Sequence, residues 1–341
     1  MKYRKIGESD LKLSVIAFGC GGNAGLMTRG DHNTQVQVIA RAVELGINYF
    51  DNSPDYGNCI AEENLGRVLK ELKTRPHLNS KVEIRAENLS DIAGHVVRST
   101  EGSLKRLGVD FLDVLQIHNG PVDPAPKMEG AYYAQLWLEH FLQKGGAIEG
   151  LQRLLNAGKV RHVGFICRGE DRPFVQQLLD TGLFSLINVP YTLMNPTAGL
   201  AKPSQLQVKD YGCVLQAAAN AKVGTAIYSP LAGGYLTDDA LHGRDRHPLA
   251  RATPGTLQAA AIKHQTAAAK LQFLAKENDI TLSQAAYRFI LSNPAVTTAI
   301  GGFSAIEQLE DIAKVADMSP ISAHDLARLN RLWESNFAAD V

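Results

Sequence analysis

The sequence predicts an α/β protein of the (β/α)8 class, a TIM barrel with an N-terminal β-hairpin and extra C-terminal helices. Eight short apolar runs resemble strands, and helix-length amphipathic stretches separate them. We expect residues 1–341 to form a single barrel domain, because no linker interrupts this alternation. A doubly wound sheet is the competing fold, but the loop FGCGGNAG after the first strand lacks its GxGxxG pattern.

The strands can be placed from their apolar character. A hairpin is expected over YRKIGESDLKLS (3–14). The barrel strands are expected at SVIAFG (14–19), INYFD (47–51), VEIRAE (82–87), FLDVLQIH (111–118), RHVGFI (161–166), SLINVP (185–190), VGTAIYS (223–229) and VTTAIG (296–301).

Helical periodicity marks the stretches between them. A helix is expected over TQVQVIARAVELG (34–46), which has apolar residues on one face and ends at Gly46. A second helix is expected over residues 90–108. HLNS (77–80) and residues 236–255 are expected to be polar loops.

The segment 121–142 is a long excursion after the fourth strand. Within it, YYAQLWLEHF (132–141) predicts a short amphipathic helix over the barrel mouth, with Tyr133, Trp137 and Phe141 on one face. A substrate lid and an oligomer contact both remain open for this helix.

Composition narrows the class of protein. The 35 basic and 35 acidic residues cancel, which gives no electrostatic argument for a nucleic-acid or membrane partner. No apolar run has the length of a membrane span or the form of a signal peptide. The cysteines form no CxxC pair and no metal-ligand spacing. We therefore expect a cytoplasmic protein with reduced thiols, no metal and a small-molecule substrate.

Polar side chains end three neighbouring strands. Asp51, Glu87 and His118 close the second, third and fourth strands, and Tyr56 follows Asp51 in the next loop. In a β/α barrel, functional sites lie at the carboxyl ends of the strands. We therefore expect these four residues to converge on one catalytic site.

Motifs along nearly the whole chain resemble the aldo-keto reductase family. They are YRKIGESDLKLSVIAFG, GINYFDNSPDYG with EENLG, SLKRLGVDFLDVLQIH, GKVRHVGF, YSPLAGGYLT and AIGGFSAIEQLED. The resemblance implies hydride transfer between NAD(P)H and a carbonyl or sugar-type substrate. Tyr56 would protonate the carbonyl oxygen, His118 would orient it, and Asp51 would hold a lysine that lowers the pKa of the phenol.

The family's lysine ends the third strand in a pattern of the type V-x-I-x-T-K, whereas VEIRAE places Glu87 there. A carboxylate beside Tyr56 would raise its pKa. The two-residue period of a strand would also turn Glu83 and Arg85 into the barrel. One hypothesis is that Arg85 reaches Asp51 and replaces the lysine charge; the alternatives are a solvated strand or a register misplaced by one or two residues.

The positions that face the cofactor in the family are also altered. Ile166 and Cys167 stand where the family has Ser-Asn, and Asn188 stands where it has Gln. No base follows the eighth strand, so NAD and NADP cannot be distinguished. The resemblance assigns Tyr228 to stacking on nicotinamide, and the stretch Gly301, Gly302, Phe303 and Ser304 to a phosphate cradle.

Two functions follow. The first is an NAD(P)-dependent oxidoreductase of the aldo-keto reductase type. The alternative is a barrel of the same ancestry without nicotinamide chemistry, either a lyase or isomerase that uses Tyr56, His118 and Glu87 as acid and base, or a non-catalytic binding protein.

Overall fold

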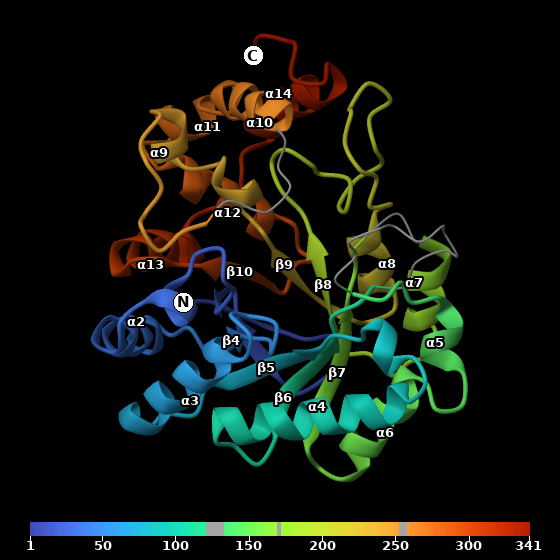
Figure 1. The fold of residues 1–341 in the computed structure, drawn as a ribbon. Helices are drawn as coiled ribbons and strands as arrows, with labels where there is room; N and C mark the ends of the chain where they lie inside the picture. The colour runs from blue at the N-terminus through green and yellow to red at the C-terminus, as the bar shows by residue number, and fades with distance from the viewer. Residues whose placement is uncertain (121–132, 169–171, 252–257) are drawn as a thin grey trace.

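A computed structural model describes residues 1–120, 133–168, 172–251 and 258–341, and its strands close into a barrel (Figure 1). All eight barrel strands are parallel, in the order β10-β3-β4-β5-β6-β7-β8-β9. They are β3 (Ile16–Gly19), β4 (Tyr49–Asp51), β5 (His77–Val82), β6 (Leu112–Ile117), β7 (Val160–Ile166), β8 (Leu186–Pro190), β9 (Gly224–Tyr228) and β10 (Thr298–Gly302). The predicted (β/α)8 barrel is confirmed.

The predicted hairpin is also present, as β1 (Tyr3–Lys5) paired with β2 (Lys12–Ser14). Its apolar residues Ile6 and Leu13 are fully buried and share a core cluster with Tyr49 and Leu186 from the strands. Ile6 also packs against Gly224, the first residue of β9. The hairpin therefore covers the end of the barrel where the strands begin, which leaves the opposite end for a site.

Helices surround the barrel (Figure 1). The α-helices are α1 (Leu26–Arg29), α2 (His32–Glu44), α3 (Ile60–Leu72), α4 (Ile92–Leu107), α5 (Leu138–Leu142), α6 (Ala147–Asn156), α7 (Arg172–Leu179), α8 (Val214–Asn220), α9 (Asp238–Leu241), α10 (Gln258–Lys270), α11 (Phe273–Lys276), α12 (Leu282–Ser292), α13 (Ile306–Ala313) and α14 (Ala323–Glu334). Short 3-10 helices are η1 (Ala86–Asn88), η2 (Ala232–Gly234) and η3 (Lys314–Asp317). The side chains of Asp31 and Asp91 cap the first turns of α2 and α4.

The third barrel strand lies earlier in the chain than predicted. The strand is β5, His77–Val82, so the expected loop at 77–80 is wrong and the expected strand at 82–87 is wrong beyond Val82. Residues 77–82 lack the apolar run that predicts a strand, because polar groups on neighbouring elements pair with their side chains. Ser80 on the helix side donates to Glu62 of α3 at 2.5 Å, and Asn79 bonds to residues inside the barrel.

The segment after β6 also differs from its prediction. Residues 121–132 lie outside the described ranges, and the helix in the remainder, α5, covers only Leu138–Leu142. Tyr133 and Trp137 precede it. Trp137 is exposed whereas Phe141 is fully buried, so the three aromatic residues do not share one helix face.

All four cysteines are free thiols. None of the helices in the described ranges combines the length with the apolar character that a membrane span requires.

We predict that Gly164→Ala destabilises the barrel strongly. Gly164 lies in β7, and a Cβ there would collide with the carbonyl oxygen of Leu186 on β8. The cost should be at least about 2 kcal/mol, because the backbone of a neighbouring strand cannot move aside. Urea unfolding followed by circular dichroism measures it.

The matched control for this change is Gly102→Ala in α4. A Cβ at Gly102 meets only the end of the Arg106 side chain, at 2.9 Å, and alanine favours the helix. We expect a change below about 1 kcal/mol. Equal stability of the two variants would contradict the predicted tight approach of β7 and β8.

Candidate active site

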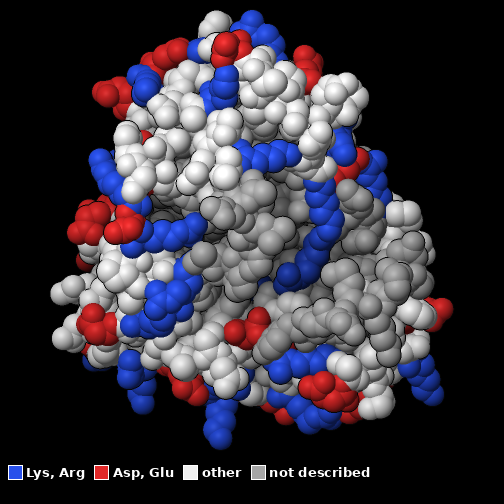
Figure 2. Space-filling model, turned by 45° about the horizontal axis from the view of Figure 1, so that its top comes forward, with Lys and Arg blue, Asp and Glu red and all other residues white. Residues whose placement is uncertain are grey.

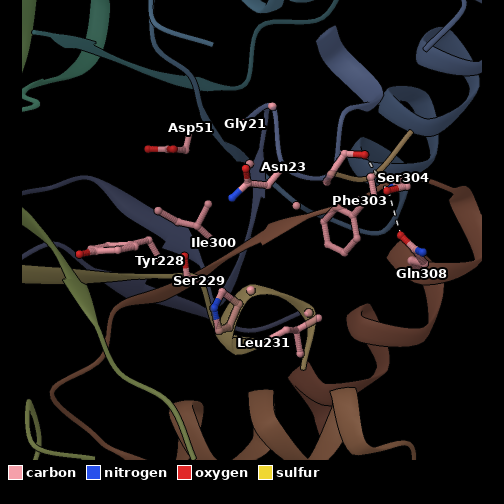
Figure 3. A pocket seen from close by; sticks show the side chains of 18 of the residues that line it. Gly21, Asn23, Asp51, Tyr228, Ser229, Leu231, Ile300, Phe303, Ser304 and Gln308 are labelled. Atoms are coloured by element: carbon pink, nitrogen blue, oxygen red, sulfur yellow. Dashed lines mark hydrogen bonds between the residues drawn. The ribbon is translucent and has the colours of Figure 1, made fainter. Parts of the chain in front are cut away.

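A cavity of about 800 Å³ opens at the carboxyl ends of the strands. Its inner end is lined by Asp51, Tyr56, Lys81 and His118. Figure 2 shows Lys and Arg side chains across the face that this view turns forward. Figure 3 shows how residues of several loops and of α13, from Gly21 and Asn23 to Leu231 and Gln308, surround the cavity. The volume suits a small organic molecule or a cofactor.

The strand order brings three of the predicted residues together. β4 pairs with β5 and β5 pairs with β6, so the loops after these strands open at the same place. Asp51 ends β4, Tyr56 follows in the next loop, and His118 directly follows β6. The rings of Tyr56 and His118 are 6.1 Å apart between centroids, edge to face. The expected convergence of these side chains is therefore present.

Lys81 on β5 is the centre of this cluster. Its Nζ lies 2.7 Å from Asp51 Oδ2, 2.8 Å from the Asn52 carbonyl oxygen and 3.1 Å from Tyr56 Oη. All three N–H groups of the ammonium are therefore directed to an acceptor. Asp51 completes its own bonding by accepting from Asn79 Nδ2 at 2.6 Å.

The fourth member, His118, is oriented by two hydroxyl groups. Its Nδ1 lies 3.3 Å from Ser53 Oγ and 3.3 Å from Tyr133 Oη. Tyr133 donates its proton to Asp55 Oδ2 at 2.6 Å, whereas the Ser53 hydroxyl accepts from the Asp55 backbone N–H. Ser53 can donate its hydroxyl proton to Nδ1, and in that arrangement the ring proton lies on Nε2.

Burial controls the protonation of this cluster. It raises the pKa of the Tyr56 phenol well above its usual range, and the Asp51 carboxylate raises that pKa further. Burial also lowers the pKa of His118 far below its usual range, and the charges of Lys81 and Arg168 act in the same direction. At neutral pH the site thus holds a protonated phenol and a neutral imidazole.

A chain of amides extends the cluster across the barrel interior. Asn79 donates to Gln116 Oε1 at 3.1 Å, and Gln116 donates to Asn188 Oδ1 at 2.8 Å. Asn188 Oδ1 accepts this hydrogen bond, so the N–H groups of the amide are left to donate into the cavity that Asn188 lines.

The prediction that Glu87 occupies the lysine position is wrong. β5 ends at Val82, so Glu87 lies in the exposed turn η1 and outside the cavity lining. The hypothesis that Arg85 substitutes for the lysine also fails, since Lys81 already binds Asp51 and Arg85 lies 3.7 Å from Glu83 Oε1. The family pattern has to be matched to HLNSKV and not to VEIRAE.

The residues expected to face a cofactor are partly brought together. Tyr228, Asn188, Gly302 and Ser304 line the cavity. Tyr228 donates to the Cys167 carbonyl oxygen at 3.3 Å. A Cβ on Gly301 would lie 2.7 Å from Tyr287 Oη, so this glycine serves packing.

Ser304 already uses its hydrogen-bonding groups within the protein. Its hydroxyl donates to the Ala24 carbonyl oxygen at 2.6 Å, and its N–H donates to Gln308 at 2.8 Å (Figure 3). Glu307 adds a negative charge to the lining nearby. The expected phosphate cradle would therefore have to displace Gln308.

The sequence analysis missed four basic residues of the lining: Lys81, Arg168, Arg246 and Arg251. Lys81 had a signal, because Asn79 and Lys81 share the inward face of a strand that continues to Val82. The arginines lie in loops, where the spacing of residues in the sequence does not predict which way a side chain points.

The fold and this cluster together define a β/α barrel with a cluster of buried titratable side chains at the carboxyl ends of its strands. The chain belongs to the Aldo/keto reductase family, whose model matches residues 15–334. It is similar to the L-glyceraldehyde 3-phosphate reductase of Escherichia coli (strain K12), with 26% identity over 98% of this chain and 96% of that protein.

Two solved structures share the fold. The aldo-keto reductase AKR11C1 from Bacillus halodurans (holo form) aligns with a TM-score of 0.72 and 21% identity, over 98% of this chain and 97% of that one. An aldo-keto reductase from Klebsiella pneumoniae in complex with NADPH aligns with a TM-score of 0.67 and 19% identity, over 98% and 96%.

The buried carboxyl of Glu83 gives a prediction for stability. Its Oε2 has no hydrogen-bond partner among the described residues. Burial raises its pKa from 4.5 to about 7, with a further contribution from the Asp55 charge. A carboxyl whose pKa is higher in the folded state favours folding less as the pH rises from about 4.5 through about 7.

We therefore expect Glu83→Gln to stabilise the protein more at pH 8.5 than at pH 4.5, by up to about 3 kcal/mol. Urea unfolding at both pH values measures the difference. The control is Glu87→Gln in the exposed turn, with changes below about 0.5 kcal/mol. A gain from Glu83→Gln that does not grow with pH would contradict the assignment.

Proposed function

We propose that this protein is an NAD(P)H-dependent reductase of carbonyl or sugar-type substrates, with Tyr56 as the proton donor. The observation that carries the proposal is the position of Lys81, whose Nζ bonds to both Tyr56 Oη and Asp51 Oδ2. A phenol that receives an N–H from an ammonium group can lose its proton and be stabilised as phenolate.

The residues at the inner end of the cavity have complementary tasks. When bound, a reduced nicotinamide supplies the hydride. As negative charge develops on the carbonyl oxygen, the Tyr56 O–H and the Nε2–H of His118 are both donors that stabilise it. Tyr56 then gives up its proton, and Lys81, held by Asp51, stabilises the phenolate that remains.

The outer part of the cavity suits a dinucleotide. The Asn188 amide and the Tyr228 ring supply a donor and an aromatic surface for a nicotinamide. Arg246 and Arg251, from the loop after β9, line the same cavity, and neither forms an ion pair within the ranges that the structure describes. They would supply the phosphate-binding charge that is absent after β10.

The lyase or isomerase alternative loses its main support. It used Glu87 as a base, and that residue lies in η1 outside the cavity lining. The altered residues Ile166 and Cys167 do not oppose the reductase, because Asn188 still offers amide N–H groups to the cavity.

We predict saturable binding of NADPH or NADH in a fluorescence titration. Replacing both Arg246 and Arg251 by Gln should weaken NADPH binding about tenfold or more, because two charge-assisted contacts to phosphate are removed. The matched control is Arg244→Gln, since Arg244 pairs with Asp239 and lies outside the lining. Failure of both nucleotides to bind at millimolar concentration would disprove the proposed function.

We predict that Lys81→Met and Tyr56→Phe each lower the kcat for carbonyl reduction by about a hundredfold or more, with little change in cofactor affinity. Steady-state kinetics with a simple aldehyde and the preferred cofactor measure this effect. Glu87→Gln should leave kcat unchanged, because Glu87 is exposed in η1. A large loss in Glu87→Gln, or full activity in Lys81→Met, would refute the assignment of Lys81.

A further inference from the structure

Arg168 holds a positive charge beside the inner end of the cavity. It follows β7, is exposed and lines the cavity with Tyr56 and His118. Its Nε donates to the His118 carbonyl oxygen at 3.0 Å, and its guanidinium carbon lies 5.1 Å from the centroid of the Tyr133 ring. These two contacts orient the guanidinium, and within the described ranges of the chain its Nη groups remain available for another partner.

Other charged lining residues at this end already have hydrogen-bond partners within the protein. Lys81 directs its three N–H groups to protein acceptors, and Asp55 accepts the Tyr133 proton. In the part of the chain that the structure describes, Arg168 forms no ion pair with a carboxylate.

The charge of Arg168 reaches the reacting groups. Burial is the main cause of the raised pKa of Tyr56, and the charge of Arg168 acts in the opposite direction and lowers this pKa. Burial is also the main cause of the low pKa of His118, followed by the charges of Lys81 and Arg168. An anion bound to Arg168 would therefore lie close to a carbonyl group held by Tyr56 and His118.

We propose that Arg168 binds an anionic group of the substrate, so that the preferred substrates are carbonyl compounds that carry a carboxylate or a phosphate. The inference rests on the proposed reductase function and specifies its substrate class. A guanidinium whose Nη groups have no partner among the described residues matches the paired oxygens of either anion. Arg168 is thus a specificity-determining residue, and the proton chemistry stays with Tyr56.

Matched pairs of aldehydes test the inference. Succinic semialdehyde is compared with butyraldehyde, which has the same chain length without the carboxylate, and glycolaldehyde phosphate is compared with glycolaldehyde. We expect a higher kcat/KM for at least one anionic member. Arg168→Gln should lower kcat/KM for that anionic member about ten- to a hundredfold, mainly through KM, and change the neutral partner less than about threefold.

Two further variants separate charge from geometry and from folding. Arg168→Lys retains the charge without the paired donors, so its kcat/KM for the anionic aldehyde should be intermediate. Arg98→Gln removes a surface arginine of α4 that pairs with Asp91, and it should leave the kcat/KM for both the anionic and the neutral aldehyde unchanged. Rising salt should reduce the preference for the anion in the wild type and not in Arg168→Gln.

The outcomes are distinguishable from failure of the proposed function. Equal loss for charged and neutral aldehydes, or a raised dissociation constant for the cofactor alone, would overturn the inference and leave the reductase in place. If no aldehyde is reduced with either cofactor, a binding measurement tests the role of Arg168 instead. Saturation-transfer NMR with hydroxybutyrate and butanol should then show binding of the carboxylate that depends on Arg168, and equal signals in wild type and Arg168→Gln would refute it.

Discussion

The site depends on one buried ion pair between neighbouring strands. Lys81 and Asp51 have side chains that are 1% and 5% exposed, and removing two charges from water to this degree is costly. The cost is offset because each charge has further partners, Asn52 and Tyr56 for the ammonium and Asn79 for the carboxylate. Loss of either member would leave the other buried without its counter-charge. The pair therefore ties the register of β4 and β5 to the position of the phenol.

The barrel interior is divided to support this pair. Near the hairpin, Ile6, Leu13 and Tyr49 form an apolar cluster that closes one end. Above it, amides carry hydrogen bonds from Asp51 across to Asn188 on β8. Polar groups in a barrel interior are tolerated when they bond to one another, and here they orient groups that face the cavity. The apolar end contributes packing, and the hydrogen bonds of the polar end orient the side chains that face the cavity.

Much of the fold could be predicted from sequence, because the other barrel strands have apolar runs that the core requires. β5 was not predicted, because it carries polar residues of the candidate site. Its inward positions carry Asn79 and Lys81, and these polar side chains removed the very pattern by which a buried strand is found. The third strand was therefore predicted in the more apolar stretch that follows β5, and this shift placed Glu87 at the lysine position. The predicted convergence of Asp51, Tyr56 and His118 was unaffected, since it needed only the order of the strands.

The other loop residues around His118 could not be assigned to the site from the sequence, because spacing within a loop does not show where a side chain lies. Tyr133 and Arg168, from the segments after β6 and β7, contact His118, and Asp55, from the loop after β4, accepts a hydrogen bond from Tyr133. In the proposed function, proton donation depends on Tyr56 and on the Lys81–Asp51 ion pair between the strands, whereas the proposed selection of charged substrates depends on Arg168. Because different elements supply the two properties, a change at Arg168 can alter which carbonyl compound binds without moving Lys81. The proposed chemical step and the proposed substrate preference can therefore be combined in one barrel.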